Sequence, residues 1–428
     1  MLRKDSAYAW YVAALLSLTH LISFVDRFVM SLVLVPIKAE MGLSDTQLGL
    51  LHGTGFVILY TVAAIPLGWA ADRANRRNII IVGIVLWSLA TAACGLATSF
   101  SGLFAARVAV GFGEAALVPA AMSLIAAYFS RGKLARAIGT FTMGASFGKS
   151  LALIVGGMIL AYLTAQGGMM LPGWGHLAPW QGLFVAAALP GLIVGLLLLS
   201  VREPARADDA VAKPGLKEVF AHIGRHRAAY LLHTAAASCA ILLVQSYGAW
   251  APTFYIRNFG FTPAEAGYAV GLVVLIASPI GHLTGGYLTD RLQARGVAGA
   301  PGVVIGTMLL LSVPVAALFC TTTDRTLSLA SYALLNVFIT ASAPPGLSGI
   351  QLLTPERLRG VTSACFMAAI TFTAIGFGPT SIGVITDLVF GDDKALGSSL
   401  LLATVIFAAL GALLGWFSRA PVRAATPT

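Results

Sequence analysis

Charged residues are scarce in this sequence. Lysine, arginine, aspartate and glutamate make up only 10% of the 428 residues, whereas hydrophobic residues make up 58%. Soluble domains carry about 25% charged residues, so this composition excludes an ordinary soluble protein. Length alone would suggest two or three soluble domains. The long apolar runs instead favour a single membrane body.

Cysteines and catalytic motifs are also sparse. The four cysteines fall inside apolar runs without a pair or a metal-ligand spacing, which predicts small buried side chains and no metal site. The sequence has no Walker loop, no H-E-x-x-H element and no G-x-S-x-G element. We therefore expect no ATP-driven transport, no enzymatic activity and no cofactor.

Twelve apolar runs are long enough to cross a bilayer, which takes about 20 residues. We predict these spans near 9–35, 47–70, 78–98, 102–128, 135–164, 180–201, 229–256, 265–288, 301–320, 327–353, 360–389 and 398–418. The pattern predicts an all-α membrane protein. We expect an N-terminal six-helix bundle at 1–201, a cytoplasmic linker at 202–228 and a C-terminal six-helix bundle at 229–428.

The positions of lysine and arginine predict the orientation of these spans. With the N-terminus in the cytoplasm, twenty of the 27 Lys and Arg residues lie in cytoplasmic segments, four in outer segments and three inside spans. Positive residues are enriched on the cytoplasmic side of membrane proteins. We therefore expect a multi-pass protein of the bacterial inner membrane with both termini in the cytoplasm. The net charge of +10 then reflects topology and indicates no nucleic-acid partner.

One loop motif occurs twice at corresponding positions. Residues 68–77 read G-W-A-A-D-R-A-N-R-R and residues 286–291 read G-Y-L-T-D-R, which indicates two copies of a six-helix unit. An aspartate at a helix end can pair with arginine and with the N–H groups of a neighbouring helix. We predict a cytoplasmic gate, with ordinary interfacial charges as the alternative. Its predicted members are Gly68, Asp72, Arg73, Arg76, Arg77, Gly286, Asp290 and Arg291.

The motif G-x-x-x-D-R-x-x-R-R resembles the signature loop of the major facilitator superfamily. Through the number of spans, the repeat and the loop, the resemblance covers the whole chain. It implies the major facilitator fold, with 12 transmembrane helices in two pseudo-symmetric six-helix bundles around a central cavity. It also implies transport by alternating access.

Five charged residues lie inside the predicted spans, where charges are costly and usually functional. They are Asp26, Arg27, Arg107, Glu114 and Lys149. The simplest closed arrangement pairs Asp26 or Glu114 with Arg27 or Arg107 across the first and fourth spans. Burial and a nearby arginine act in opposite directions on the protonation of a carboxyl group. We therefore predict that Asp26 and Glu114 take up and release protons, with a static ion pair as the alternative.

A closer resemblance rests on the same residues. The D-R pair in the first span and G-F-G-E at 111–114 resemble the spinster branch of the superfamily. W-Q-G-L-F at 180–184 and V-R-E-P-A-R at 201–206 support it. Animal members of that branch export lysophospholipids and sphingosine 1-phosphate. The resemblance implies that Asp26, Arg27 and Glu114 form a proton and headgroup relay, with Arg107 as a further member.

Three more residues are candidates for substrate binding. Lys149 lies mid-span and is predicted either to bind an anionic headgroup or to be a neutral or paired buried lysine, and the sequence leaves both open. Tyr247 and Trp250 in the seventh span offer polar and aromatic groups to a cavity. Glycines at four-residue spacing, such as Gly144 and Gly148, predict close helix packing.

Together with the resemblance to the spinster branch, these observations predict a secondary transporter, proton-coupled or facilitative, of an amphiphilic lipid such as a lysophospholipid or a sphingosine 1-phosphate-like anion. Arg27, Arg107 or Lys149 would hold the headgroup. The alternatives are a transporter of a small organic anion, sugar or drug, and a non-transporting membrane receptor. We expect a monomer in the lipid bilayer whose partners are the small amphiphilic substrate and protons.

Overall fold

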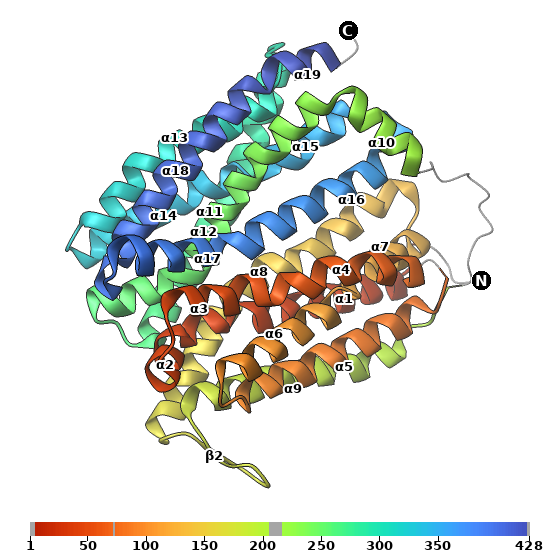
Figure 1. Cartoon of the computed structure of the whole chain (residues 1–428). Helices are drawn as coiled ribbons and strands as arrows, with labels where there is room; N and C mark the ends of the chain where they lie inside the picture. The colour runs from red at the N-terminus through yellow and green to blue at the C-terminus, as the bar shows by residue number, and fades with distance from the viewer. Residues whose placement is uncertain (1–4, 72, 205–215, 426–428) are drawn as a thin grey trace. The chain divides into compact units, whose positions relative to one another are not determined.

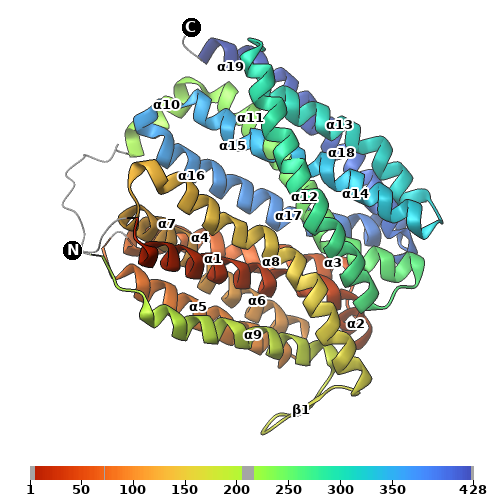
Figure 2. The same cartoon turned by 180° about the vertical axis from the view of Figure 1, so that it is seen from behind.

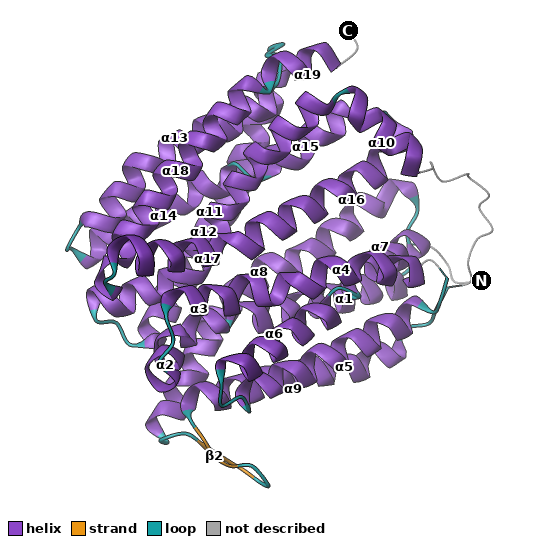
Figure 3. Ribbon diagram, in the orientation of Figure 1, coloured by secondary structure: helices purple, strands orange, loops and turns teal. Residues whose placement is uncertain are grey.

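The computed structural model describes residues 5–71, 73–204 and 216–425. Helices form almost all of it (Figure 3). In this described part, twelve helical segments are long and apolar enough to cross a membrane, which confirms the predicted number of spans and the all-α class. Some spans are longer than predicted, and the first runs over Ala7–Met41 rather than 9–35. The extra turns are less apolar, so hydropathy alone does not detect them.

The first six spans comprise nine α-helices, a π-helical turn (η1) and a 3₁₀ turn (η2). They are α1 (Ala7–Phe28), α2 (Met30–Met41), α3 (Asp45–Gly49), η1 (Leu50–Thr54), α4 (Gly55–Ala71), α5 (Arg76–Gly95), α6 (Phe100–Glu114), α7 (Leu117–Tyr128), α8 (Arg131–Ala165), α9 (Pro179–Leu197) and η2 (Leu198–Ser200). A short antiparallel hairpin, β1 (Met169–Leu171) and β2 (Gly175–Leu177), joins α8 to α9 and pairs Met169 with Leu177.

The last six spans follow the amphipathic helix α10 (Leu216–Arg225). They comprise α11 (Arg227–Phe259), α12 (Pro263–Ala294), α13 (Ala300–Thr321), α14 (Arg325–Ala341), α15 (Pro344–Leu353), η3 (Glu356–Leu358), α16 (Arg359–Ile370), η4 (Thr371–Ile375), α17 (Gly376–Val384), η5 (Ile385–Phe390), η6 (Asp393–Ala395), α18 (Leu396–Phe417) and α19 (Arg419–Ala425). The turns η4 and η5 are π-helical, and η3 and η6 are 3₁₀ turns.

The chain divides into two compact units. The first unit contains Met1–Asp208 and Ala249–Leu272, and the second contains Asp209–Gly248 and Val273–Thr428. The end of α11 and the start of α12 therefore pack with the first six spans. The predicted bundle boundaries at 201 and 229 stay a prediction.

Glycines allow the helices of each unit to approach closely. In the first unit α1 and α8 lie side by side (Figure 1 and Figure 2). A Cβ on Gly144 would lie 2.1 Å from the carbonyl oxygen of Ser17, and one on Gly148 would lie 2.4 Å from that of Leu21. These distances are too short for any side chain. They confirm the packing role predicted for the two glycines.

Breaks in two spans position the intramembrane charges. The first span is interrupted at Val29, directly after Asp26 and Arg27. The fourth span is interrupted between α6 and α7, directly after Glu114. Pro119 explains the second break, because proline has no N–H to donate to the carbonyl four residues earlier. Asp26, Arg27 and Glu114 therefore lie at or near the ends of helices.

Candidate functional site

Four of the five predicted intramembrane charges lie together in the first unit. Asp26 and Arg27 come from α1, and Arg107 and Glu114 come from α6. All four are buried, with at most 7% of their surface exposed. The Nη2 atom of Arg27 donates to Oε2 of Glu114 at 2.6 Å. This ion pair joins the first and fourth spans.

Aromatic rings hold the guanidinium group of Arg27. Its central carbon lies 4.7 Å from the ring centroid of Phe24 and 4.1 Å from that of Phe56. Aromatic faces attract cations, and the attraction is larger where water is excluded. The rings therefore stabilise Arg27 without occupying all its donors. Among the described residues, Nε of Arg27 and Oε1 of Glu114 have no hydrogen-bond partner.

Asp26 is buried completely and its hydrogen-bonding capacity is unused. Neither carboxylate oxygen has a hydrogen-bond partner in the described part of the chain. Trp87 and Thr91 of α5 approach Asp26, but their N–H and hydroxyl groups lie outside hydrogen-bonding geometry. An unpartnered buried polar group costs free energy, about 1–3 kcal/mol for a neutral group and more for a charged one. Such a carboxyl group is suited to a change of protonation state.

Arg107 contacts a π-helical turn. Its Nε donates to the carbonyl oxygen of Leu51 in η1 at 3.2 Å. A π-helical turn changes the regular backbone pairing, and such turns are frequent at functional sites. The span carrying this turn lies against α6 at Gly111, where a Cβ would lie 1.9 Å from the carbonyl oxygen of Phe56. Sequence reasoning missed η1, because no proline or charge signals it.

The other predicted substrate-binding residues have different surroundings. Lys149 is half-buried in α8, and its Nζ lies 4.8 Å from the ring centroid of Phe28. Tyr247 is buried in the second unit, where its hydroxyl group hydrogen-bonds Oγ1 of Thr404 at 2.8 Å. Trp250 is buried completely in the first unit. In this conformation neither Tyr247 nor Trp250 reaches a surface.

The predicted gating residues of the first loop contact Glu203. Arg76 donates to Oε1 of Glu203 at 2.6 Å and to the carbonyl oxygen of Pro204 at 2.9 Å. The backbone N–H of Arg77 donates to the other carboxylate oxygen of Glu203 at 3.1 Å. Arg73 stacks on Trp69 at 4.0 Å. The loop is therefore tied to the end of the sixth span.

Other members of the predicted gate have few close contacts or lie outside the described part. Asp72 lies outside the described residues. A Cβ on Gly68 would make only an ordinary contact with Pro119, and one on Gly286 would meet nothing within 4 Å. Asp290 is exposed, and Arg291 donates to the hydroxyl group of Tyr287 at 3.0 Å. The gating role stays a prediction.

A third buried carboxylate, Asp45, lies at the start of α3 and was missed by sequence reasoning. Arg257 donates to both of its carboxylate oxygens, at 2.5 Å and 2.7 Å, and Lys38 donates at 2.7 Å. Asp45 is completely buried. Arg257 is 212 residues away in sequence, so spacing provides no signal for the contact. We call Lys38, Asp45 and Arg257 the outer triad, after the predicted orientation.

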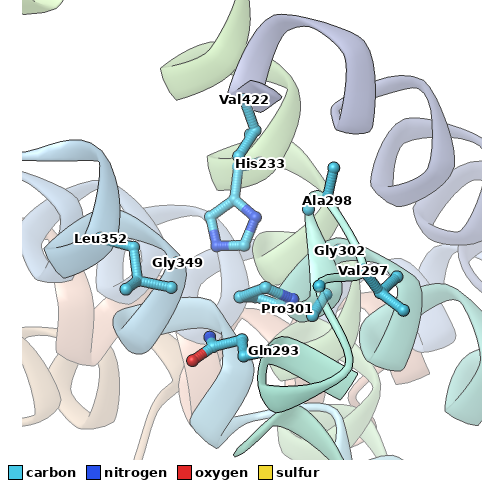
Figure 4. Close-up of a pocket in the computed structure, with 12 residues that line it drawn as sticks. His233, Gln293, Val297, Ala298, Pro301, Gly302, Gly349, Leu352 and Val422 are labelled. Atoms are coloured by element: carbon cyan, nitrogen blue, oxygen red, sulfur yellow. The ribbon is translucent and has the colours of Figure 1, made fainter. Parts of the chain in front are cut away.

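The second unit contains a pocket of about 500 Å³ beside His233. Figure 4 shows the imidazole between the segments that line it, which include Gln293, Val297, Pro301 and Leu352. His233 lies 2.8 Å from the carbonyl oxygen of Gly346 through Nε2. A Cβ on Gly349 would lie 2.2 Å from that nitrogen, so glycine is required there. His233 is thus a partnered structural histidine.

Comparison with known proteins assigns the family. The model of the Major Facilitator Superfamily matches residues 16–379. The chain belongs to the major facilitator superfamily. This membership confirms the family predicted from the duplicated loop. It also makes the protein a multi-pass membrane transporter and not an enzyme.

Relatives within this superfamily differ in the cargo that their names state. An MFS-type efflux pump of Mycolicibacterium smegmatis is 28% identical and covers 98% of this chain and 95% of its own. A D-galactonate transporter of Escherichia coli is 25% identical, covering 85% of this chain and 86% of its own. The sphingosine-1-phosphate transporter of Danio rerio is 27% identical over 57% of this chain and 47% of its own.

A solved structure supports the fold. A bacterial homolog of the human lysosomal transporter spinster, in an inward-facing and unoccupied conformation, matches with a TM-score of 0.87. It is 24% identical, and the match covers 99% of both chains. This match confirms the major facilitator fold. Protein spinster of Drosophila melanogaster, 26% identical over 76% of this chain and 53% of its own, confirms the resemblance to the spinster branch.

Proposed function

We propose that the protein is a proton-coupled secondary transporter of an amphiphilic anion, such as a lysophospholipid or a sphingosine 1-phosphate-like lipid. It works by alternating access in a bacterial inner membrane, with both termini in the cytoplasm. The single observation that carries the proposal is the buried Arg27–Glu114 pair beside the unpartnered carboxyl group of Asp26. The excess of lysine and arginine in predicted cytoplasmic segments supports the orientation.

Proton coupling follows from competition for Arg27. While Glu114 is ionised, it holds the guanidinium group of Arg27. A proton on Glu114 removes the negative charge and frees Arg27 to bind another anion. Asp26 provides a second acidic group in the same cluster, where it interacts with the charges of Glu114 and Arg107. Proton binding and anion binding are thereby linked, because both change the partner of one arginine.

The charge balance of the site favours an anionic substrate. Arg27, Arg107 and Lys149 carry three positive charges, and Asp26 and Glu114 carry at most two negative ones. Protonation of either carboxyl group increases the positive excess. The relatives that are named for a cargo support the same chemistry, because sphingosine 1-phosphate and D-galactonate are both anions. The resemblance to the spinster branch supports the amphiphilic tail.

The test is substrate-driven proton movement in proteoliposomes that contain the purified protein. Lysophosphatidate and sphingosine 1-phosphate are added to vesicles with an internal pH dye. A proton flux with either lipid, lost in Glu114→Gln, is the expected result. The absence of flux with both lipids, together with a flux for D-galactonate, would refute the lipid cargo and leave the coupling intact. A lipid flux that persists in Glu114→Gln and Asp26→Asn would refute the coupling.

A small sugar acid is the second candidate cargo. The D-galactonate transporter supports it, because that match covers far more of both chains than the match to the sphingosine-1-phosphate transporter. Competition separates the two. Excess D-galactonate that abolishes lysophosphatidate-driven flux would favour a site for small anions, whereas undiminished flux favours the lipid.

A further inference from the structure

A buried histidine with an unused ring nitrogen lies next to the cluster. His52 is in the π-helical turn η1 and is 3% exposed. Its Nε2 lies 2.9 Å from Oγ of Ser31. Among the described residues, its Nδ1 has no hydrogen-bond partner. His52 therefore differs from His233, whose imidazole is used by a backbone carbonyl group.

The contact with Ser31 is compatible with either tautomer of His52, and one of them makes the free nitrogen a donor. A neutral imidazole has one N–H donor and one acceptor nitrogen. When the hydroxyl group of Ser31 donates to Nε2, the ring proton lies on Nδ1. Ser31 is four residues after Arg27, so the contact between Ser31 and His52 lies about one helical turn from Arg27. In the tautomer in which Ser31 donates to Nε2, the Nδ1–H group is a buried donor without a hydrogen-bond partner among the described residues.

The charged groups that act on His52 are positive. The edge of Phe28 faces His52, with ring centroids 5.9 Å apart, and the same ring lies 4.8 Å from Nζ of Lys149. One aromatic ring therefore contacts both residues. The charges that act on His52 are those of Arg107, Lys149 and Arg27, and all three are positive. An anion near Phe28 would meet a cation and a neutral N–H donor together.

We propose that His52 is a substrate-positioning residue whose Nδ1–H group donates to the anionic group of the substrate, while Lys149 neutralises its charge. The inference rests on the proposed function and defines the headgroup subsite of that same site. It gives Lys149 the headgroup-binding role, one of the two roles that the sequence left open. The subsite is built from α1, α2, η1 and α8, all of which lie in the first unit. Its ligand is a phosphate or carboxylate.

The test compares two amphiphiles that differ only in the phosphate group. Binding of 1-oleoyl lysophosphatidate and of monooleoylglycerol to the full chain in nanodiscs is measured for wild type, His52→Leu and His52→Gln. We expect His52→Leu to weaken lysophosphatidate binding about tenfold, because a hydrogen bond to a charged group is lost. His52→Gln retains an N–H donor and should restore part of the affinity. Monooleoylglycerol binding should be unchanged in both variants.

Matched controls separate this role from packing. His233→Leu removes a buried imidazole from the second unit and should leave the preference for lysophosphatidate intact. Lys149→Gln should weaken lysophosphatidate binding, and adding His52→Leu should weaken it by less than the sum of the two effects. If His52→Leu does not fold, His52→Gln decides: it must reduce the preference for lysophosphatidate over monooleoylglycerol.

Three results would overturn the inference. Unchanged lysophosphatidate binding in both His52 variants, with weakened binding in Lys149→Gln, removes His52 and leaves the proposed function standing. An equal loss for both amphiphiles shows a packing role. A wild-type protein that binds neither lysophosphatidate, sphingosine 1-phosphate nor D-galactonate refutes the proposed cargo class, and the inference fails with it.

Discussion

Two completely buried aspartates in the first unit have opposite surroundings. Asp45 receives hydrogen bonds from Arg257 on both carboxylate oxygens and a further one from Lys38. Asp26 receives none from any residue that the structure describes. Both are shielded from water to the same extent. Burial alone therefore does not distinguish a structural charge from a functional one.

The difference in hydrogen bonding does distinguish them. A buried charge whose partners are complete is held in one state, because losing any partner leaves an uncompensated charge. A buried carboxyl group without donors has no hydrogen bonds that favour its ionised form. The outer triad thus joins the N-terminal spans to the end of α11. Under the proposed function, Asp26 and Glu114 are the groups that change their charge.

The largest expected effect is the loss of proton flux when Asp26 or Glu114, the proposed proton-coupling residues, is neutralised. Asp26→Asn and Glu114→Gln should each reduce substrate-driven proton flux to background. Removing the negative charge from Asp26 takes away no hydrogen bond, so the thermal midpoint of the Asp26→Asn variant should equal or exceed that of the wild type. Proton flux in proteoliposomes and thermal unfolding of the same preparations provide the two measurements. A strongly destabilised Asp26→Asn would show that Asp26 is held like Asp45, and the comparison would fail.

Neutralising Asp45 should have the second largest effect, a decrease in the free energy of unfolding. Asp45→Asn leaves Arg257 and Lys38 without their counter-charge, and breaking a buried pair costs about 3–5 kcal/mol. Denaturant unfolding in detergent measures the loss. Lys38→Met is the matched control and should cost far less, because the side chain of Lys38 is 21% exposed and Arg257 still pairs with Asp45. Equal losses of stability in the two variants would contradict the structural role of the outer triad.

Arg27→Lys should have an intermediate effect, a lower affinity for the anion. It tests whether the charge of Arg27 or its stacking on aromatic rings matters for the site. Lysine keeps the positive charge near Glu114 but cannot stack a planar group on Phe24 and Phe56. The lost stacking corresponds to about 0.5–2 kcal/mol, so we expect anion affinity to fall several-fold while proton flux persists. Lysophosphatidate titration and proton flux on one preparation test this. Loss of the proton flux would show that charge alone does not couple Arg27 to Glu114.

The sequence predicted some of these features because they depend on local chemistry. Twelve spans follow from the length of apolar runs, and the association of the first and fourth spans follows from the opposite charges that both spans carry. The actual partner of Arg27 was not predictable, since two acids and two bases allow several pairings. The break at Val29 has no proline or glycine at that position. The outer triad joins residues far apart in sequence, so only tertiary packing reveals it.

The smallest effect on stability is expected at Asp290, where the gate prediction can be tested. Asp290 is exposed at the end of the eighth span, unlike Asp45 and Asp26. Asp290→Asn should therefore leave the thermal midpoint unchanged. If the duplicated loop is a gate, the variant should still slow transport, because a contact made only in the other conformation is lost. The rate of lysophosphatidate-driven flux measures this. A normal rate would show that Asp290 is an ordinary interfacial charge.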